Sequence, residues 1–321
     1  MDLIYMNGSR TDIGVLSDYK LDLAYGKDEN NFELLIPSSQ HCCGSGFYLY
    51  VENTEYGGVI DSIRSDTEQQ EVTYSGRTWH GILDSKIIAP DAGADYLILS
   101  GDANGVILTL LKRIGLAELF TVVSAASGLM ISSYKMPRYI HAYEGIRKML
   151  DSVSAKLKVT FSNGMVVLAV VPRVDYTEQD EFDSDKVDFR CTRNYRPVNH
   201  LICLGRGELA AREVVHLYVD PTGVISKTQT MTGLLERTEV YDYPNAESLA
   251  ELEEGGRERL KELSVADEIK INLGADDAGY EIQDVVGATD NITGLSVTAK
   301  IAKKIVTIDQ GEVEISYEVE E

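Results

Sequence analysis

The sequence has 321 residues, 44% of them hydrophobic, which is enough for two or three modest domains with packed cores. Its 52 acidic residues outnumber its 30 basic residues and give a formal net charge of −22. Because phosphate binding needs clustered Lys and Arg, this charge argues against nucleic acid and anionic lipid as partners and favours less acidic partner proteins.

The chain carries no recognisable export or membrane signal. Its start, Met1 to Arg10, has no basic segment followed by an apolar one. No apolar run approaches the roughly 20 residues of a membrane helix. The four cysteines, at 42, 43, 191 and 203, form neither a C-x-x-C pair nor a disulfide framework. We therefore expect a protein made in a reducing cytoplasm, with no membrane insertion.

Strand patterns dominate the first 90 residues. In YKLDLAYG every second residue is large and apolar, which predicts a strand with one buried face. That face comprises Tyr19, Leu21, Leu23 and Tyr25. Residues 78–88 predict a short helix that Pro90 ends.

The middle of the chain mixes helix and strand patterns. Residues 105–113 predict a helix closed by Gly115. After Pro137, apolar residues recur every three or four positions, which predicts a helix over residues 138–156. Its apolar stripe comprises Tyr139, Tyr143, Ile146, Leu150, Val153 and Leu157. Asn163-Gly164 lies between two apolar runs and predicts a tight β-hairpin.

The last third has one helix pattern followed by strands. Asn245 is a suitable N-cap for a helix with a leucine stripe, which Gly255-Gly256 is expected to weaken or kink. The final strand has one apolar face, which comprises Val313, Ile315, Tyr317 and Val319. The order of strands, a mixed middle and strands again predicts an α+β, β-rich chain whose two ends share one body.

A dinucleotide-binding spacing, G-x-G-x-x-A, occurs at Gly205, Gly207 and Ala210. Such a turn needs a following helix, whose N-terminus holds the pyrophosphate. Here a β-branched, alternating segment begins at Val214 and leaves no room for that helix. We therefore expect two strands joined by a glycine-containing loop, and no cofactor.

Other candidate chemistry is weak. In His41-Cys42-Cys43, neighbouring strand residues point to opposite faces and do not easily converge on a metal. Cys203 lies in an apolar strand, a poor place for a reactive thiolate, and no serine lies in a G-x-S-x-G turn. The acidic pairs 253–254 and 276–277 are expected by chance in so acidic a chain, and Glu253 fits an ion pair with Arg257. We assign no catalytic, cofactor-binding or metal residues.

The only tryptophan, Trp79, lies in YSGRTWHGILDSKII beside Arg77 and His80. The segment suits either a sugar-binding patch or a short helix that covers a sheet. Aromatic residues at helical spacing favour packing.

Four segments in succession carry a family resemblance. They are YSGRTWHGILDSKII, RYIHAYEGIRKMLDSVSAKLKVTFSNGMVVLAV, NHLICLGRGELAAREVVHLYVD and YEIQDVVGATDNITGLSVTAKIAKKIVTIDQGEVEISYEV. Together, over residues 15–321, they resemble the tail hub (baseplate hub) proteins of long-tailed phages and prophages of Gram-positive bacteria.

The resemblance implies a homotrimer at the distal end of the tail tube, in which each subunit carries two related β-barrel-like domains. The implied domains are an N-terminal β-rich hub domain at 1–90, a mixed α/β middle domain at 91–198, and a second β-rich hub domain at 199–321 whose last strands complete the N-terminal body. The implied partners are tail tube or distal tail proteins and tail-tip or fibre proteins. The implied location is the virion tail tip, after assembly in the cytoplasm of the bacterial host.

We therefore expect a non-enzymatic structural protein that joins the tail tube to the baseplate or tail tip. One alternative is a tail-associated hydrolase of cell-wall glycan, with His80 or an acidic pair as acid and base. Another is a carbohydrate-binding tip protein built around Trp79 and surface tyrosines. A cleft with two facing carboxylates would favour the hydrolase.

Overall fold

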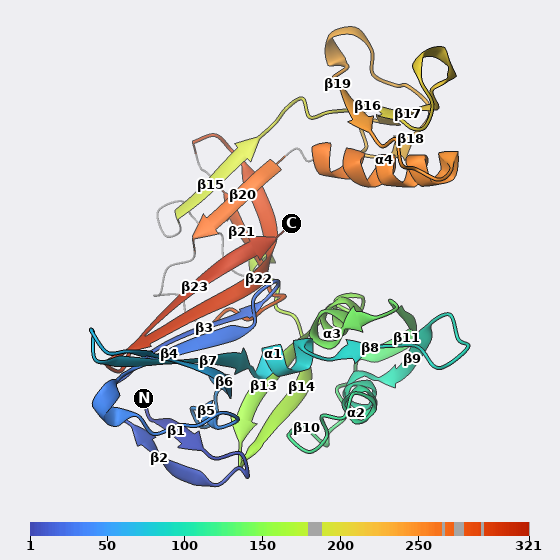
Figure 1. The fold of residues 1–321 in the computed structure, drawn as a ribbon. Coiled ribbons are helices and arrows are strands. Elements are labelled where there is room, and N and C mark those ends of the chain that lie inside the picture. Colours follow the sequence, from blue (N-terminus) through green and yellow to red (C-terminus); the bar gives the residue numbers. More distant parts are fainter. Residues whose placement is uncertain (179–187, 265–266, 273–278, 290–291, 321) are drawn as a thin grey trace. The chain divides into compact units, whose positions relative to one another are not determined.

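The computed structural model describes residues 1–178, 188–264, 267–272, 279–289 and 292–320 (Figure 1). Strands predominate over helices, so the prediction of a β-rich α+β fold is confirmed. The chain divides into two compact units, one of Met1–Phe189 with Lys270–Glu321 and one of Arg190–Ile269. None of the helices in the described part of the chain is both long and apolar enough to cross a membrane.

The first unit contains a ten-stranded sheet built from both ends of the chain (Figure 1). Its strands are β1 (Leu3–Met6), β2 (Asp12–Leu16), β3 (Lys20–Gly26), β4 (Asn31–Pro37), β5 (Tyr48–Tyr50), β6 (Gly57–Asp66), β7 (Glu71–Thr78), β21 (Val285–Thr289), β22 (Ser296–Asp309) and β23 (Glu312–Glu320). They follow the order β2-β1-β5-β6-β7-β4-β3-β22-β21, and β23 pairs with β22. The antiparallel pairing of β22 with β3 joins the end of the chain to its beginning.

The predicted faces of β3 and β23 hold in the structure. Tyr19, just before β3, and Leu21, Leu23 and Tyr25 of β3 are all buried. In β23, Tyr317 is buried, and Val313 and Ile315 pack against the same core. The end strands β2 and β21 do not pair with each other, so no closed barrel is present among the described strands. The two related barrel-like domains implied by the resemblance therefore stay a prediction.

The rest of the first unit consists of three helices and short sheets. These elements are η1 (Ser38–Gln40), α1 (Trp79–Asp84), β8 (Ile87–Ile88), β9 (Leu97–Asp102), α2 (Ala103–Arg113), β10 (Phe120–Val122), β11 (Met130–Met136), β12 (Ile140–His141), α3 (Ala142–Asp151), β13 (Ala155–Ser162), β14 (Met165–Pro172) and η2 (Tyr176–Glu178). The predicted hairpin is the β13–β14 pair, whose turn residues Asn163 and Gly164 have φ of 54° and 75°. Positive φ at both positions is what a two-residue hairpin turn requires.

Two predicted helices are shorter than their sequence patterns suggested. Ile87 and Ile88, expected in the first helix, pair as β8 with Ile140 and His141 of β12. That pairing ends α1 early and delays the start of α3. The predicted end of the second helix is also wrong, because α3 ends at Asp151 and the chain enters strand β13 at Ala155, which places Val153 and Leu157 of the predicted stripe outside the helix. Tyr139, the first residue of the predicted stripe, lies before α3 and is 65% exposed, whereas Ile146 and Leu150 are fully buried.

The second unit is a four-stranded sheet packed against one helix. Its elements are β16 (His200–Leu204), η3 (Leu209–Ala211), β17 (Val214–Val219), β18 (Ile225–Ser226), η4 (Gly233–Leu235), β19 (Thr238–Asp242) and α4 (Leu249–Leu263). Separately, β15 (Asp188–Arg193) pairs with β20 (Asp267–Asn272). The N-cap of α4 is Ser248, not Asn245, and Leu249 is exposed.

The expected break at Gly255-Gly256 is absent, because α4 runs unbroken through both residues. Gly256 lies against the sheet, where a Cβ would be only 2.4 Å from Sγ of Cys203. The glycine therefore allows close packing of the helix on β16 and does not interrupt the helix.

A buried ion pair connects the middle of the first unit to its C-terminal part. Nζ of Lys156, on β13, lies 2.7 Å from both carboxylate oxygens of Asp284 and 2.6 Å from Glu281. Asp284 is fully buried and also accepts a hydrogen bond from the backbone N–H of Val174. Burial alone would lower the pKa of Lys156, but the hydrogen bonds to Asp284 and Glu281 outweigh it and raise that pKa.

A second buried group surrounds His80. Its ring stacks on Tyr25 at 4.6 Å and meets the edge of Tyr143 at 5.1 Å. Nδ1 of His80 is buried without a hydrogen-bond partner. Burial lowers the pKa of His80 to about 4, although Glu55 opposes the shift. The imidazole is therefore neutral at pH 7.

Replacement of Asp284 by Asn should destabilise the first unit strongly. The substitution removes the fully buried counter-ion of Lys156 and leaves it only the partly exposed Glu281, and loss of one partner of a buried ion pair typically costs about 3–5 kcal/mol. A matched control is Asp61→Asn, because Asp61 pairs with Arg77 at the surface and both side chains are about 40% exposed. The control should cost less than about 1 kcal/mol. Equal free energies of unfolding for the two variants in urea would contradict the structural role of Asp284.

Because His80 is buried and neutral, we expect acid to destabilise the protein at pH values above those at which ordinary carboxylates titrate. Its folded pKa of about 4 is below the usual 6.5, so the unfolded state binds more protons between these values. Stability should therefore fall as the pH drops, by about 1.4 kcal/mol per pH unit. His80→Phe keeps a flat ring for stacking and should flatten the decline between pH 6.5 and 5, measured by urea unfolding. An unchanged slope in the variant would show that His80 is not responsible.

Candidate functional site

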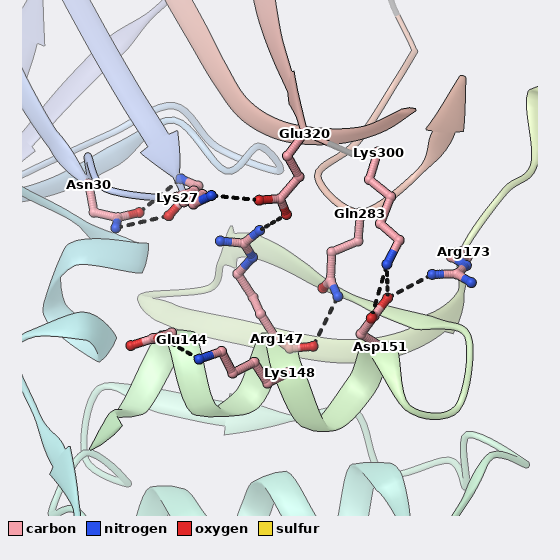
Figure 2. Close-up of polar contacts among 11 residues, drawn as sticks. Lys27, Asn30, Glu144, Arg147, Lys148, Asp151, Arg173, Gln283, Lys300 and Glu320 are labelled. Atoms are coloured by element: carbon pink, nitrogen blue, oxygen red, sulfur yellow. Dashed lines mark hydrogen bonds and ion pairs between the residues drawn. The ribbon is translucent and has the colours of Figure 1, made fainter. Parts of the chain in front are cut away.

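A polar cleft of about 480 Å³ opens on the first unit between α3, the β3–β4 turn and the ends of the C-terminal strands (Figure 2). Its lining residues are Gly26, Lys27, Asp28, Asn30, Asp84, His141, Tyr143, Glu144, Arg147, Lys148, Asp151, Gln283, Lys300 and Glu320. These positions are widely separated in the sequence, and no local motif marked them. Pairing of β22 with β3 brings the β3–β4 turn beside the C-terminal strands, and contacts of Arg147 with Gln283 and Glu320 join α3 to them.

One side of the cleft is closed by Glu320, near the end of β23. Its carboxylate lies 3.0 Å from Nζ of Lys27 and 3.4 Å from the guanidinium of Arg147, as Figure 2 shows. Arg147 is largely buried, and Gln283 donates a hydrogen bond to its backbone carbonyl. The C-terminal strand is thus tied to both α3 and the β3–β4 turn.

The other side is closed by Asp151, at the end of α3. Its carboxylate lies 2.9 Å from Nζ of Lys300 and 2.7 Å from the guanidinium of Arg173 (Figure 2). On the helix surface, Lys148 and Glu144 form an i,i+4 pair at 2.7 Å. In each of these ion pairs, a charged side chain of the cleft is paired with one of opposite charge.

The carboxylates of the cleft are mostly paired with cations from other parts of the first unit. Burial raises the pKa of the Asp84 carboxyl, which lines the cleft. A glycosidase needs a second carboxylate as base or nucleophile. Three of the other carboxylates that line the cleft, those of Glu144, Asp151 and Glu320, are held by cations, whereas Asp28 of the β3–β4 turn also lines it. These ion pairs hold the C-terminal strands to α3 and to the β3–β4 turn.

The residues around the tryptophan are packed inside the first unit. Trp79 is fully buried and stacks on Phe161 at 5.2 Å, which confirms the packing interpretation of this segment. Its ring is therefore not available as a surface platform for sugar. His80, the acid or base of the hydrolase alternative, is 2% exposed and lies at a small pocket of about 190 Å³ that Glu55 and Glu281 also line. Both carboxylates are engaged by lysines, Glu55 by Lys304 at 2.7 Å and Glu281 by Lys156 at 2.6 Å.

His41, Cys42 and Cys43 are organised around one hydroxyl group. The Tyr74 hydroxyl lies 2.6 Å from Nδ1 of His41 and accepts hydrogen bonds from the backbone N–H groups of both cysteines. Burial raises the pKa of the Cys43 thiol. Within the ranges that the structure describes, no group of three or more His, Cys, Asp and Glu side chains is arranged to hold a metal ion.

The glycine motif is a tight connection between β16 and β17. A three-residue 3₁₀ turn, η3, follows Gly207, and β17 begins at Val214. Gly207 has φ of +95°, and a Cβ there would lie 2.5 Å from the carbonyl of Ala211. The glycine serves this turn, and residues 205–219 contain no α-helix that could receive a pyrophosphate.

The remaining candidates also have structural explanations or lie outside the described residues. Burial raises the pKa of the Cys203 thiol to about 11, which disfavours a thiolate. Glu253 pairs with Arg257 at 2.9 Å, as predicted. Residues 276–277 lie outside the described ranges, and nothing is assigned to them.

Two histidines far apart in the sequence meet on the second unit. Nε2 of His200 lies 2.9 Å from Nδ1 of His216, and its Nδ1 lies 2.7 Å from Glu236. The rings of His200 and Tyr218 stack at 4.3 Å. No sequence pattern indicated this contact, because β16 and β17 bring the two residues together only in the folded sheet.

Comparison with known sequences gives no match, either to a protein-family model or to a curated protein. Solved structures do match. The 43 kDa tail protein of prophage MuSo2 from Shewanella oneidensis is 14% identical with a TM-score of 0.52, over 99% of this chain and 98% of that chain. A prophage tail protein from Listeria monocytogenes is 11% identical with a TM-score of 0.50, over 99% and 94%.

A tail protein from Neisseria meningitidis is 13% identical with a TM-score of 0.49, over 100% of this chain and 96% of that chain. At such identities a structural likeness establishes fold and does not by itself transfer function. Over nearly its whole length, the chain shares the fold of prophage tail proteins.

Proposed function

We propose that this protein is a non-enzymatic structural component of a phage or prophage tail, and that it acts there as a homotrimeric hub between the tail tube and the baseplate or tail tip. The observation that carries the proposal is the fold shared with two prophage tail proteins over 99% of the chain. The sequence resemblance to tail hub proteins, which rests on the order of four segments, supports the same role.

The internal organisation of the first unit is consistent with this role. The pairing of β22 with β3 supports the idea that both ends of the chain build one body. The polar cleft is closed by its own ion pairs, which suits a scaffold. The division into hub domains 1–90 and 199–321 with a middle domain 91–198, and a Gram-positive host, remain parts of the proposal.

The proposed partners are further copies of the chain, tail tube or distal tail proteins, and tail-tip or fibre proteins. A trimer would carry about three times the net charge of −22. Such a charge favours neighbours that are less acidic, because like charges repel across an interface.

The test is the mass and shape of the full-length protein in solution. We expect light scattering after size exclusion to give about three times the chain mass of 35.5 kDa, with a three-fold ring and a central channel in negative-stain images. A closed ring is expected because cyclic symmetry satisfies every subunit interface. A monomer at all concentrations up to about 100 µM would contradict the trimeric hub, since protein interfaces with weaker dissociation constants are transient.

A further inference from the structure

Three charged side chains meet in the first unit, where strand β13 contacts the segment just before β21. Nζ of Lys156 lies 2.7 Å from each oxygen of the Asp284 carboxylate and 2.6 Å from a carboxylate oxygen of Glu281. The side chains of Lys156 and Asp284 are 5% and 0% exposed. An amine and a carboxyl group are therefore held in contact away from water, with a second carboxylate beside the amine.

The surroundings of the Asp284 carboxyl suit the addition of a nucleophile to its carbon. The equal distances from Nζ of Lys156 to the two oxygens place the nitrogen close to that carbon, and groups held in such contact react far faster than the same groups in solution. One oxygen accepts a hydrogen bond from the backbone N–H of Val174 at 2.8 Å, and the other accepts one from the backbone N–H of Glu281 at 2.9 Å. Fixed N–H groups of this kind stabilise the negative charge that develops on oxygen during addition.

Glu281 connects this buried pair to the surface. Its side chain is 35% exposed and lines the pocket of about 190 Å³ that His80 also lines. A carboxylate in contact with an amine can accept a proton from it and return the proton to a leaving group, as general acid–base groups do. The pocket gives a small leaving molecule a route to solvent.

We propose that Lys156 and Asp284 form an intramolecular amide (isopeptide) bond after the chain has folded. A proton first moves from the Lys156 ammonium group to the Asp284 carboxylate, a transfer that burial promotes because both charges have lost their hydration. Nζ then bonds to the carboxyl carbon, and Glu281 takes a proton from Nζ and returns it to the departing hydroxyl group. The carbon–oxygen bond breaks and one water molecule leaves. An ammonium group and a carboxylate thus become an amide and water, without an oxidant, a metal or another reactant.

The bond would change the stability of the first unit in two ways. It replaces two buried charges by a neutral amide, which removes their desolvation cost. It also closes a loop between positions 128 residues apart, and so long a loop restricts the unfolded chain strongly. The inference concerns a single chain and does not depend on the proposed trimer.

Mass spectrometry of the full-length protein tests the bond directly. After incubation of the folded protein at neutral pH until its mass is constant, we expect an intact mass lower by one water molecule. Trypsin should release a branched peptide that joins residues 149–158 to residues 271–300, because an amide at Lys156 blocks cleavage there. An unchanged mass together with the free peptide 149–156 would overturn the inference.

The same molecule contains a matched control pair, Lys300 and Asp151. Nζ of Lys300 lies 2.9 and 3.0 Å from the two Asp151 oxygens, but the two side chains are 33% and 39% exposed (Figure 2). Water hydrates both charges there, so we expect no amide between these residues. A branched peptide from Lys300 and Asp151 in the same yield as that from Lys156 and Asp284 would show that burial does not direct the reaction, and the inference would be wrong.

Two substitutions separate the covalent step from the fold. Lys156→Arg keeps a cation beside Asp284, but a guanidinium group does not lose its proton in proteins and cannot attack the carboxyl carbon. We expect this variant to fold, as judged by circular dichroism, and to keep its full sequence mass. Glu281→Gln keeps Lys156 beside Asp284 and removes the proton carrier, so the loss of water should slow by at least about 100-fold. Loss of water from Lys156→Arg, or loss at the wild-type rate from Glu281→Gln, would contradict the proposed reaction.

Discussion

The architecture of the first unit depends on the buried ion pair between Lys156 and Asp284. Burial of two charges costs several kcal/mol for each ion unless other groups replace the lost water. Here Asp284 accepts two hydrogen bonds from Lys156 and two more from the backbone N–H groups of Val174 and Glu281. The pair connects positions that are 128 residues apart, so the central hairpin and the C-terminal strands must come together in one arrangement.

Other contacts of the C-terminal strands repeat this long-range pattern. Lys304 of β22 lies 2.7 Å from Glu55, which also accepts a hydrogen bond from the buried Tyr25. Glu320 of β23 pairs with Lys27 and Arg147. A charged residue of the last two strands thus meets a partner from the first half of the chain at several points. The polar cleft is a consequence of this junction, and its charges are largely occupied in maintaining it.

The cations of the cleft are used inside the first unit. Lysines and arginines that close the cleft are held by carboxylates of the same unit. In the proposed trimer, these cations would therefore contribute little to attraction between copies, each of which has a net charge of −22.

Sequence alone determined the features that depend on neighbouring residues. Alternation predicted the buried face of β3, and Asn163-Gly164 predicted the β13–β14 hairpin, because side-chain period and turn geometry are local properties. The absence of room for a helix after Gly207 could likewise be seen in the sequence, and the structure has a 3₁₀ turn there.

Tertiary structure decided the features that depend on distant partners. The pairing of β8 with β12 set where α1 ends and α3 begins, although the helical periodicity continued beyond both limits. Gly256 proved to be a contact point for Cys203 and not a break in α4. The cleft, the contact of His200 with His216 and the burial of Lys156 had no sequence signature. A local pattern shows which side of a strand or helix is apolar, but only the folded chain determines which remote backbone or charge that side meets.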